Sequence, residues 1–112
     1  METKLALSID LSKEIIGFNQ KPMVYQDNNG THRNMTVRDA LQAAISSLPP
    51  KQEFSTLSMI HKMIPKLGND QEELLLEELE EKNFLVESVK QTEVLSPVAK
   101  TFIIIGVLKK TQ

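Results

Sequence analysis

The sequence predicts an α+β fold: a single small domain in which an N-terminal β-hairpin or small antiparallel sheet packs on three to four α-helices. Within residues 1–35, polar and apolar side chains alternate over 4–11, and an Asn-Gly pair beside extended residues is typical of strands joined by a tight turn. From residue 36 onward, apolar residues recur at helical spacing. A chain of 112 residues, 40% of them hydrophobic, suffices for one core. We therefore expect a β-hairpin region at 1–35 and a mainly helical region at 36–112.

Strand patterns come first in the chain. Residues 4–11 predict a half-buried strand, because every second side chain is apolar. Residues 22–26 predict a short strand and residues 31–34 its return, with Asp27-Asn28-Asn29-Gly30 between them. Asn and Gly both tolerate a positive φ, so this pair favours a hairpin turn. The inner side of the first strand carries Leu5, Leu7, Ile9 and Leu11.

The most clearly delimited helix is predicted to begin at Thr36. The Thr36 side chain is suited to cap this helix, in a capping box completed by Asp39. The pair Pro49-Pro50 ends it, because proline lacks the backbone N–H that a helix interior requires. The buried stripe of this helix consists of Val37, Ala40, Leu41, Ala44, Ile45 and Leu48.

Two further helices are expected between residues 54 and 89. The first runs from Phe54 or Ser55 to Ile64 and is stopped by Pro65 and Gly68; its inner residues are Leu57, Ile60, Ile64 and Leu67. The second is capped by Asp70 and turns its glutamates to water. Its inner stripe is Leu75, Leu76, Leu79 and Val86.

The last element is predicted to be a helix that starts at Ser96-Pro97, because serine caps helices and proline favours their first turn. Apolar residues then keep helical spacing at Val98, Phe102, Ile105 and Leu108. Residues 101–108 are also rich in β-branched side chains, so a buried strand stays open as an alternative.

The charge of the chain is unevenly distributed. The formal net charge is −2, yet residues 70–82 contain seven acids and one base, a sum of −6, which leaves +4 for the rest. We expect either a plain solvated face or a docking surface for a basic partner on Glu73, Glu77, Glu80 and Glu81. The apolar surplus near the carboxyl end predicts a second contact, made by Phe102, Ile103, Ile104 and Val107.

The residues that enzymes and metal sites need are scarce. There is no cysteine, the two histidines (His32 and His61) have no ligand-like spacing, and the four glycines are too dispersed for a phosphate-binding loop. The turn at Asp27 resembles the start of a calcium loop, but position 12 of that loop is Arg38 instead of the glutamate required. We therefore expect no catalytic residue, no cofactor and no metal, and a protein that is not an enzyme.

The order of these motifs resembles a group of small, uncharacterised bacteriophage and prophage proteins. The motifs are the alternating strand from Leu5 to Leu11, Lys21-Pro22, the Asp-Asn-Asn-Gly turn, Thr36-Val-Arg-Asp-Ala-Leu41, Asp-Gln-Glu-Glu at 70–73 and Leu95-Ser-Pro-Val98. The resemblance implies a viral accessory role in the host cytoplasm or the virion and carries over no catalytic residue. The glutamate run and residues 102–108 depart from the group.

Residues 55–89 are also similar to winged-helix domains, which suggests an alternative. This resemblance implies that 86–89 and 101–108 pair as a wing with its tip at 90–100, in a nucleic-acid-binding regulator. Its basic residues would be Arg33, Arg38, Lys51, Lys62, Lys66, Lys109 and Lys110. Because the recognition helix would bring six glutamates toward phosphates, we favour binding to a protein or to a second copy, in a homo-oligomer or larger assembly. Neither nucleic acid nor a membrane is expected as the partner.

Overall fold

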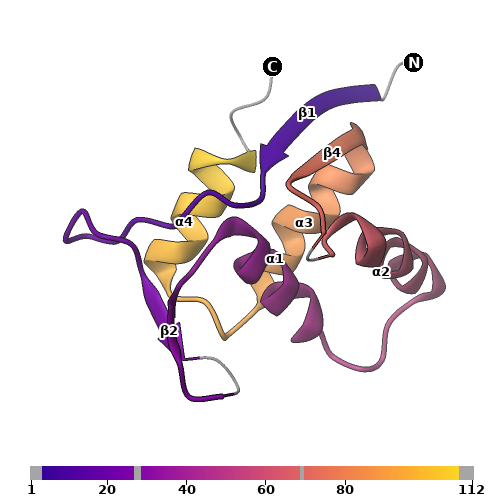
Figure 1. Ribbon diagram of the computed structural model, residues 1–112. Helices are drawn as coiled ribbons and strands as arrows, with labels where there is room; N and C mark the ends of the chain where they lie inside the picture. Colours follow the sequence, from indigo (N-terminus) through magenta and orange to yellow (C-terminus); the bar gives the residue numbers. More distant parts are fainter. Residues whose placement is uncertain (1–3, 27–28, 69, 109–112) are drawn as a thin grey trace.

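The computed structural model describes residues 4–26, 29–68 and 70–108, and it confirms the α+β class. These ranges contain four helices and two antiparallel sheets of two strands each (Figure 1). In chain order the elements are β1 (Lys4–Asp10), β2 (Val24–Gln26), β3 (His32–Asn34), α1 (Val37–Ser46), α2 (Phe54–Lys66), β4 (Glu73–Glu78), α3 (Leu79–Gln91) and α4 (Pro97–Gly106).

The first strand pairs with the fourth, antiparallel, and this sheet has one buried and one exposed face. Ile9 lies opposite Leu74 and Leu7 opposite Leu76, and all but the half-buried Leu7 are buried. Ser8 and Leu75 form the neighbouring pair on the exposed face. The alternation expected for the first strand is therefore confirmed from Leu7 to Leu11; the side chain of Leu5 lies outside the described part of the chain.

The helix predicted to begin at Asp70 is wrong over residues 73–78, which form β4. Leu74 and Leu76 are buried while Leu75 is 52% exposed, so burial follows the two-residue period of a strand. Leu75 and Leu79, both predicted as core residues, are exposed. The physical reason is tertiary: β1 has a free row of backbone groups, and the leucine run of β4 satisfies them while burying alternate side chains.

The predicted hairpin is confirmed in β2 and β3. Val24 pairs with Asn34 and Gln26 with His32, and Gly30 has a φ of 84° in the turn between them. Asp27 and Asn28 of that turn lie outside the described residues. The backbone N–H of Met35 donates to Met23 O at 2.7 Å, and the N–H of Ile15 donates to Met35 O at 2.9 Å. These bonds join the hairpin to the segment that follows β1.

The caps predicted for the first and last helices are also confirmed. Thr36 Oγ1 accepts a hydrogen bond from the Asp39 backbone N–H, and Asp39 Oδ2 accepts one from the Thr36 N–H, which is the reciprocal capping box. At the start of α4, Ser96 Oγ accepts from the Ala99 N–H. Because α4 is a helix, the alternative of a buried strand over 101–108 is wrong. The wing pairing is wrong too, since 86–89 lies within α3.

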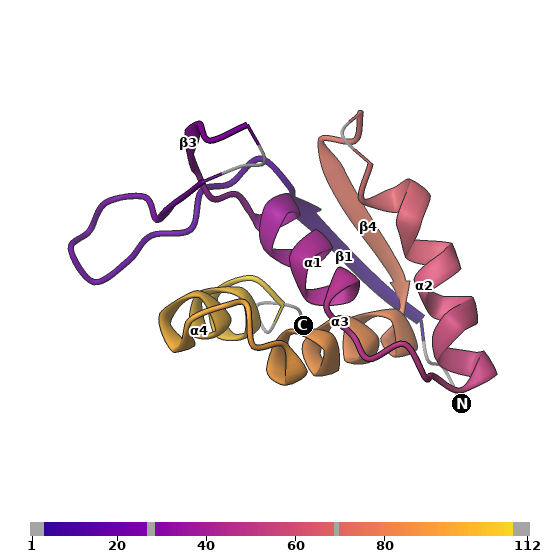
Figure 2. The same ribbon diagram turned by 90° about the horizontal axis from the view of Figure 1, so that it is seen from below.

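Helix α3 is the central helix of the core. It contacts α1, α2, α4 and β4, and Figure 2 shows it running from the end of β4 toward α4. In both views α2 lies at one edge of the molecule and the β2–β3 hairpin at the opposite end (Figures 1 and 2). The helical part of the core is formed by Val37, Ala40, Leu41, Ala44, Met63, Leu85, Val89, Ala99 and Ile103. No helix in the described ranges has the length and apolar character needed to cross a membrane.

Candidate protein-binding surfaces

The four glutamates predicted as one exposed face are divided between a strand and a helix. Glu73 and Glu77 are exposed on β4, and Glu80 is exposed in the first turn of α3. Ser8 Oγ donates a hydrogen bond to Glu73 Oε1, across the outer face of the sheet. Glu81, in contrast, is fully buried, so the prediction that it belongs to an exposed docking face is wrong.

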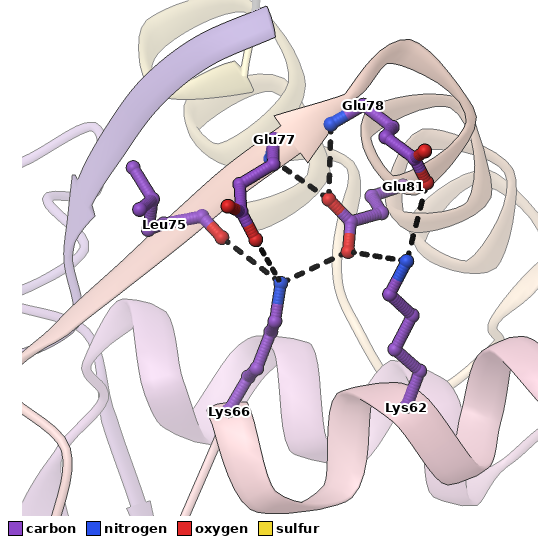
Figure 3. A network of polar contacts seen from close by, with 6 residues as sticks. All are labelled: Lys62, Lys66, Leu75, Glu77, Glu78 and Glu81. Atoms are coloured by element: carbon purple, nitrogen blue, oxygen red, sulfur yellow. Dashed lines mark hydrogen bonds and ion pairs between the residues drawn. The ribbon is translucent and has the colours of Figure 1, made fainter. Parts of the chain in front are cut away.

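The Glu81 carboxylate of α3 is surrounded by hydrogen-bond donors from two other elements, β4 and α2 (Figure 3). Its Oε1 accepts from the backbone N–H of Glu77 at 2.8 Å and of Glu78 at 3.1 Å. Its Oε2 accepts from Lys66 Nζ at 2.9 Å and lies 3.2 Å from Lys62 Nζ. Both lysines belong to α2, so this one side chain ties α2 to the junction of β4 and α3.

Electrostatics explain why a buried carboxylate is tolerated here. Burial alone raises the pKa of Glu81, but the hydrogen bonds from Lys66, from the Glu77 and Glu78 backbone and from Lys62 outweigh it and lower the pKa to about 2. The same contacts with Glu78 and Glu81 raise the pKa of Lys62. Lys66 Nζ also donates to the Leu75 carbonyl at 3.2 Å. The acidic segment therefore contributes to the internal structure at Glu81 and to the surface elsewhere.

The apolar contact predicted on the last helix is only partly at the surface. Ile103 and Val107 are buried in the core, so their assignment to a contact surface is wrong. Ile104 and Phe102 are half-buried and pack against that core. Lys13 Nζ lies 5.5 Å from the centre of the Phe102 ring, at cation–π distance. The helical period turns all four of the predicted residues inward or sideways, whereas Ile105, which was placed on the inner spacing of this helix, points outward.

The outer side of α2 carries apolar side chains that the sequence interpretation assigned to the core or passed over. Phe54 is 84% exposed, Ile64 is 63% exposed and Leu57 is also exposed. With the exposed His61 they form one line along the helix, which we call the outer α2 stripe (Phe54, Leu57, His61 and Ile64). Met63 is the buried residue of α2, on the other side. The sequence feature that could have indicated an exposed stripe is that apolar residues occupy two sides of this helix, of which only one can face the core.

Two hollows flank α2. A hollow of about 230 Å³ between α1 and α2 borders the outer α2 stripe and is lined by Gln42, Ile45, Ser46, Met63, Ile64 and Leu67. The second hollow, of about 440 Å³, lies where α2, α3 and the end of α1 meet. We call it the acid-rimmed groove; its lining residues are Leu48, Gln52, Ser55, Thr56, Met59, Glu80, Asn83, Phe84, Glu87, Ser88 and Gln91.

Within the described ranges, no three histidine or carboxylate side chains are placed to share a metal ion. His32 lies in β3 and His61 in α2, and the β2–β3 hairpin and α2 lie at opposite ends of the molecule in both views (Figures 1 and 2). Comparison of the chain with protein-family models, curated proteins and solved structures finds no match. The function is therefore argued below from the surfaces themselves.

Proposed function

We propose that the chain is a non-catalytic accessory protein that acts by protein–protein interaction, and that the outer α2 stripe joins two copies of it. The observation that carries the proposal is the exposure of Phe54, Leu57 and Ile64 on one side of a single helix. Apolar side chains grouped in this way at the surface favour a protein contact, because association removes them from water.

The spacing of the stripe fits a second copy of the same helix. From Phe54 to Leu57, His61 and Ile64 the steps are three, four and three residues, which read the same in both directions. In an antiparallel pair of α2 helices, Phe54 of each copy therefore faces Ile64 of the other, and Leu57 faces His61. Such reciprocity is what the two-fold symmetric interface of a homodimer requires.

The surroundings of the stripe support the same arrangement. Ser58 and Pro65 are exposed beside it and carry no charge, so two copies approach without like-charge repulsion across the stripe. Antiparallel helices also oppose their dipoles. The hollow between α1 and α2 shares Ile64 with the stripe, and a partner helix would cover its rim as well. This extension matters because stable interfaces bury about 800 Å² on each partner.

Light scattering at increasing protein concentration tests the dimer. The expected mass rises from the 12.7 kDa of one chain toward twice that value. The double variant Phe54→Ser, Ile64→Ser should stay monomeric while keeping its circular dichroism spectrum, because both side chains are exposed in the monomer. The matched control Phe18→Ser removes a phenyl ring that is 90% exposed in the loop before β2. It should dimerise like the unmodified chain.

The proposal is wrong if the unmodified chain remains a monomer at every concentration, or if Phe18→Ser and not the α2 variant abolishes the dimer. Because the chain resembles small phage proteins, we propose that the dimer acts as part of a virion or binds another protein in the host cytoplasm.

A further inference from the structure

The acid-rimmed groove combines an apolar floor with a charged edge. Leu48, Met59 and Phe84 are half-buried in it, whereas Glu80 and Glu87 are exposed on the α3 side. Among the residues that line it in the described part of the chain there are two carboxylates and no lysine or arginine. Its volume of about 440 Å³ lies within the range of binding sites. A ligand that fits has an apolar body and positive charge.

The spacing of the two carboxylates along α3 restricts the shape of that ligand. Glu80 and Glu87 are separated by two helical turns, about 10 Å along the axis, and so project from the same side. Asn83 and Phe84 lie between them on that side and belong to the groove. Lys90 Nζ lies 3.8 Å from Glu87 Oε2 in an exposed pair, which offsets part of one charge only.

We propose that the acid-rimmed groove binds a basic amphipathic helix of a partner protein, with two lysine or arginine residues seven positions apart and apolar residues between them. This inference rests on the proposed protein-binding function and names the class of partner. In a helix, residues seven positions apart lie on one side and are about 10 Å apart, which matches Glu80 and Glu87. In an extended segment, two residues separated by the same distance are three positions apart, and their side chains point to opposite sides.

The groove and the outer α2 stripe are separate surfaces of the same helix. At about 100° per residue, Met59 in the groove lies on the opposite side of α2 from Leu57 and Ile64 of the stripe. A dimer formed through the stripe therefore leaves the groove open. Charge complementarity at Glu80 and Glu87 favours a different occupant there, and a basic helix laid in an apolar groove is a recurring mode of recognition.

Synthetic peptides test the inference directly. The probe is a fluorescein-labelled, alanine-based peptide with two lysines seven residues apart and leucines at the third and fourth positions after the first lysine. Its affinity is measured by fluorescence anisotropy. The double variant Glu80→Gln, Glu87→Gln should bind it about tenfold more weakly. Glu93→Gln, which removes an exposed carboxylate outside the groove lining, should bind it as the unmodified chain does.

Two control peptides distinguish recognition of charge and spacing from nonspecific binding. A peptide with glutamate in place of both lysines should not bind, and one with its lysines on opposite sides of the helix should bind weakly. Raising the salt concentration to about 0.5 M should weaken the cognate complex, because the rim charges are exposed. The inference is overturned if none of the lysine peptides binds at millimolar concentration, or if the glutamine double variant and the Glu93 control bind alike.

The proposed dimer and the proposed peptide binding are tested independently of each other. The variant Phe54→Ser, Ile64→Ser keeps Glu80 and Glu87, so it should bind the lysine peptide as a monomer. Peptide binding without any dimer would overturn the proposed role of the stripe and leave the groove supported. A dimer that binds none of the basic peptides would support dimerisation through the stripe and overturn helix binding in the groove.

Discussion

At the scale of single residues, the buried Glu81 carboxylate of α3 links its own helix to α2 and to β4. It receives two backbone N–H groups at the junction of β4 and α3 and two lysine ammonium groups from α2. A buried carboxylate is costly unless its charge is compensated in this way. Helix α2 contributes the buried Met63 and the half-buried Met59 to the core, and the lysine contacts add to its attachment.

Replacing Glu81 by Gln should therefore lower the free energy of unfolding by about 3 kcal/mol, because two lysines then lose their buried counter-charge. Urea unfolding followed by circular dichroism measures this loss. The matched control is Glu87→Gln, whose exposed pair with Lys90 should change stability by less than about 1 kcal/mol. Equal losses in the two variants would contradict the structural role of Glu81.

The lowered pKa of Glu81 makes a further prediction about acid. In the unfolded chain the pKa is near 4.5, and in the folded chain it is about 2, so the folded state favours the ionised form. This contribution is complete above pH 4.5 and is lost as the pH falls toward 2. The stability difference between the unmodified chain and Glu81→Gln should shrink over that window, as measured by urea unfolding at several pH values. A difference independent of pH would contradict the assignment.

At the scale of elements, the leucines of β4 separate a strand from a helix. Leu76 is buried and lies opposite Leu7 of β1, while its neighbour Leu75 is 52% exposed. Leu76→Ala should cost about 2–5 kcal/mol of unfolding free energy through the lost transfer energy and the cavity. Leu75→Ala should cost less than about 1 kcal/mol. Comparable losses at both positions would instead indicate the helix that the sequence predicted here.

Local signals were sufficient for some elements and insufficient for others. The cap at Thr36, the Ser96-Pro97 start and the Asn-Gly turn act within a few residues, and the sequence predicted α1, α4 and the hairpin correctly. The run Leu74–Leu76 fits a strand or a helix equally well, and its outcome depends on β1. The burial of Glu81 depends on lysines from α2 in the same way. The outer α2 stripe could not be predicted from periodicity, because α2 has apolar residues on two sides and the sequence assigned Leu57 and Ile64 to the buried one.

At the scale of the whole molecule, the two proposed binding surfaces both depend on the position of helix α2. Helix α2 carries the outer α2 stripe on one side and part of the acid-rimmed groove on the other, and Glu81 fixes its position against β4 and α3. Loosening of α2 should therefore weaken both the dimer and the peptide complex. Glu81→Gln is expected to impair the two together, whereas the surface variants impair one each.

The pairing of β1 with β4 also has a consequence for how the chain folds. Ser8 and Glu73, which meet across this sheet, are 65 positions apart in the sequence. Contacts of such long separation close late, because the entropy of a large loop must be overcome before they form. During synthesis β1 leaves the ribosome first and stays without its partner strand until β4 emerges. The local contacts of the hairpin and of the Thr36 capping box are available in the meantime, whereas the sheet has to wait for β4.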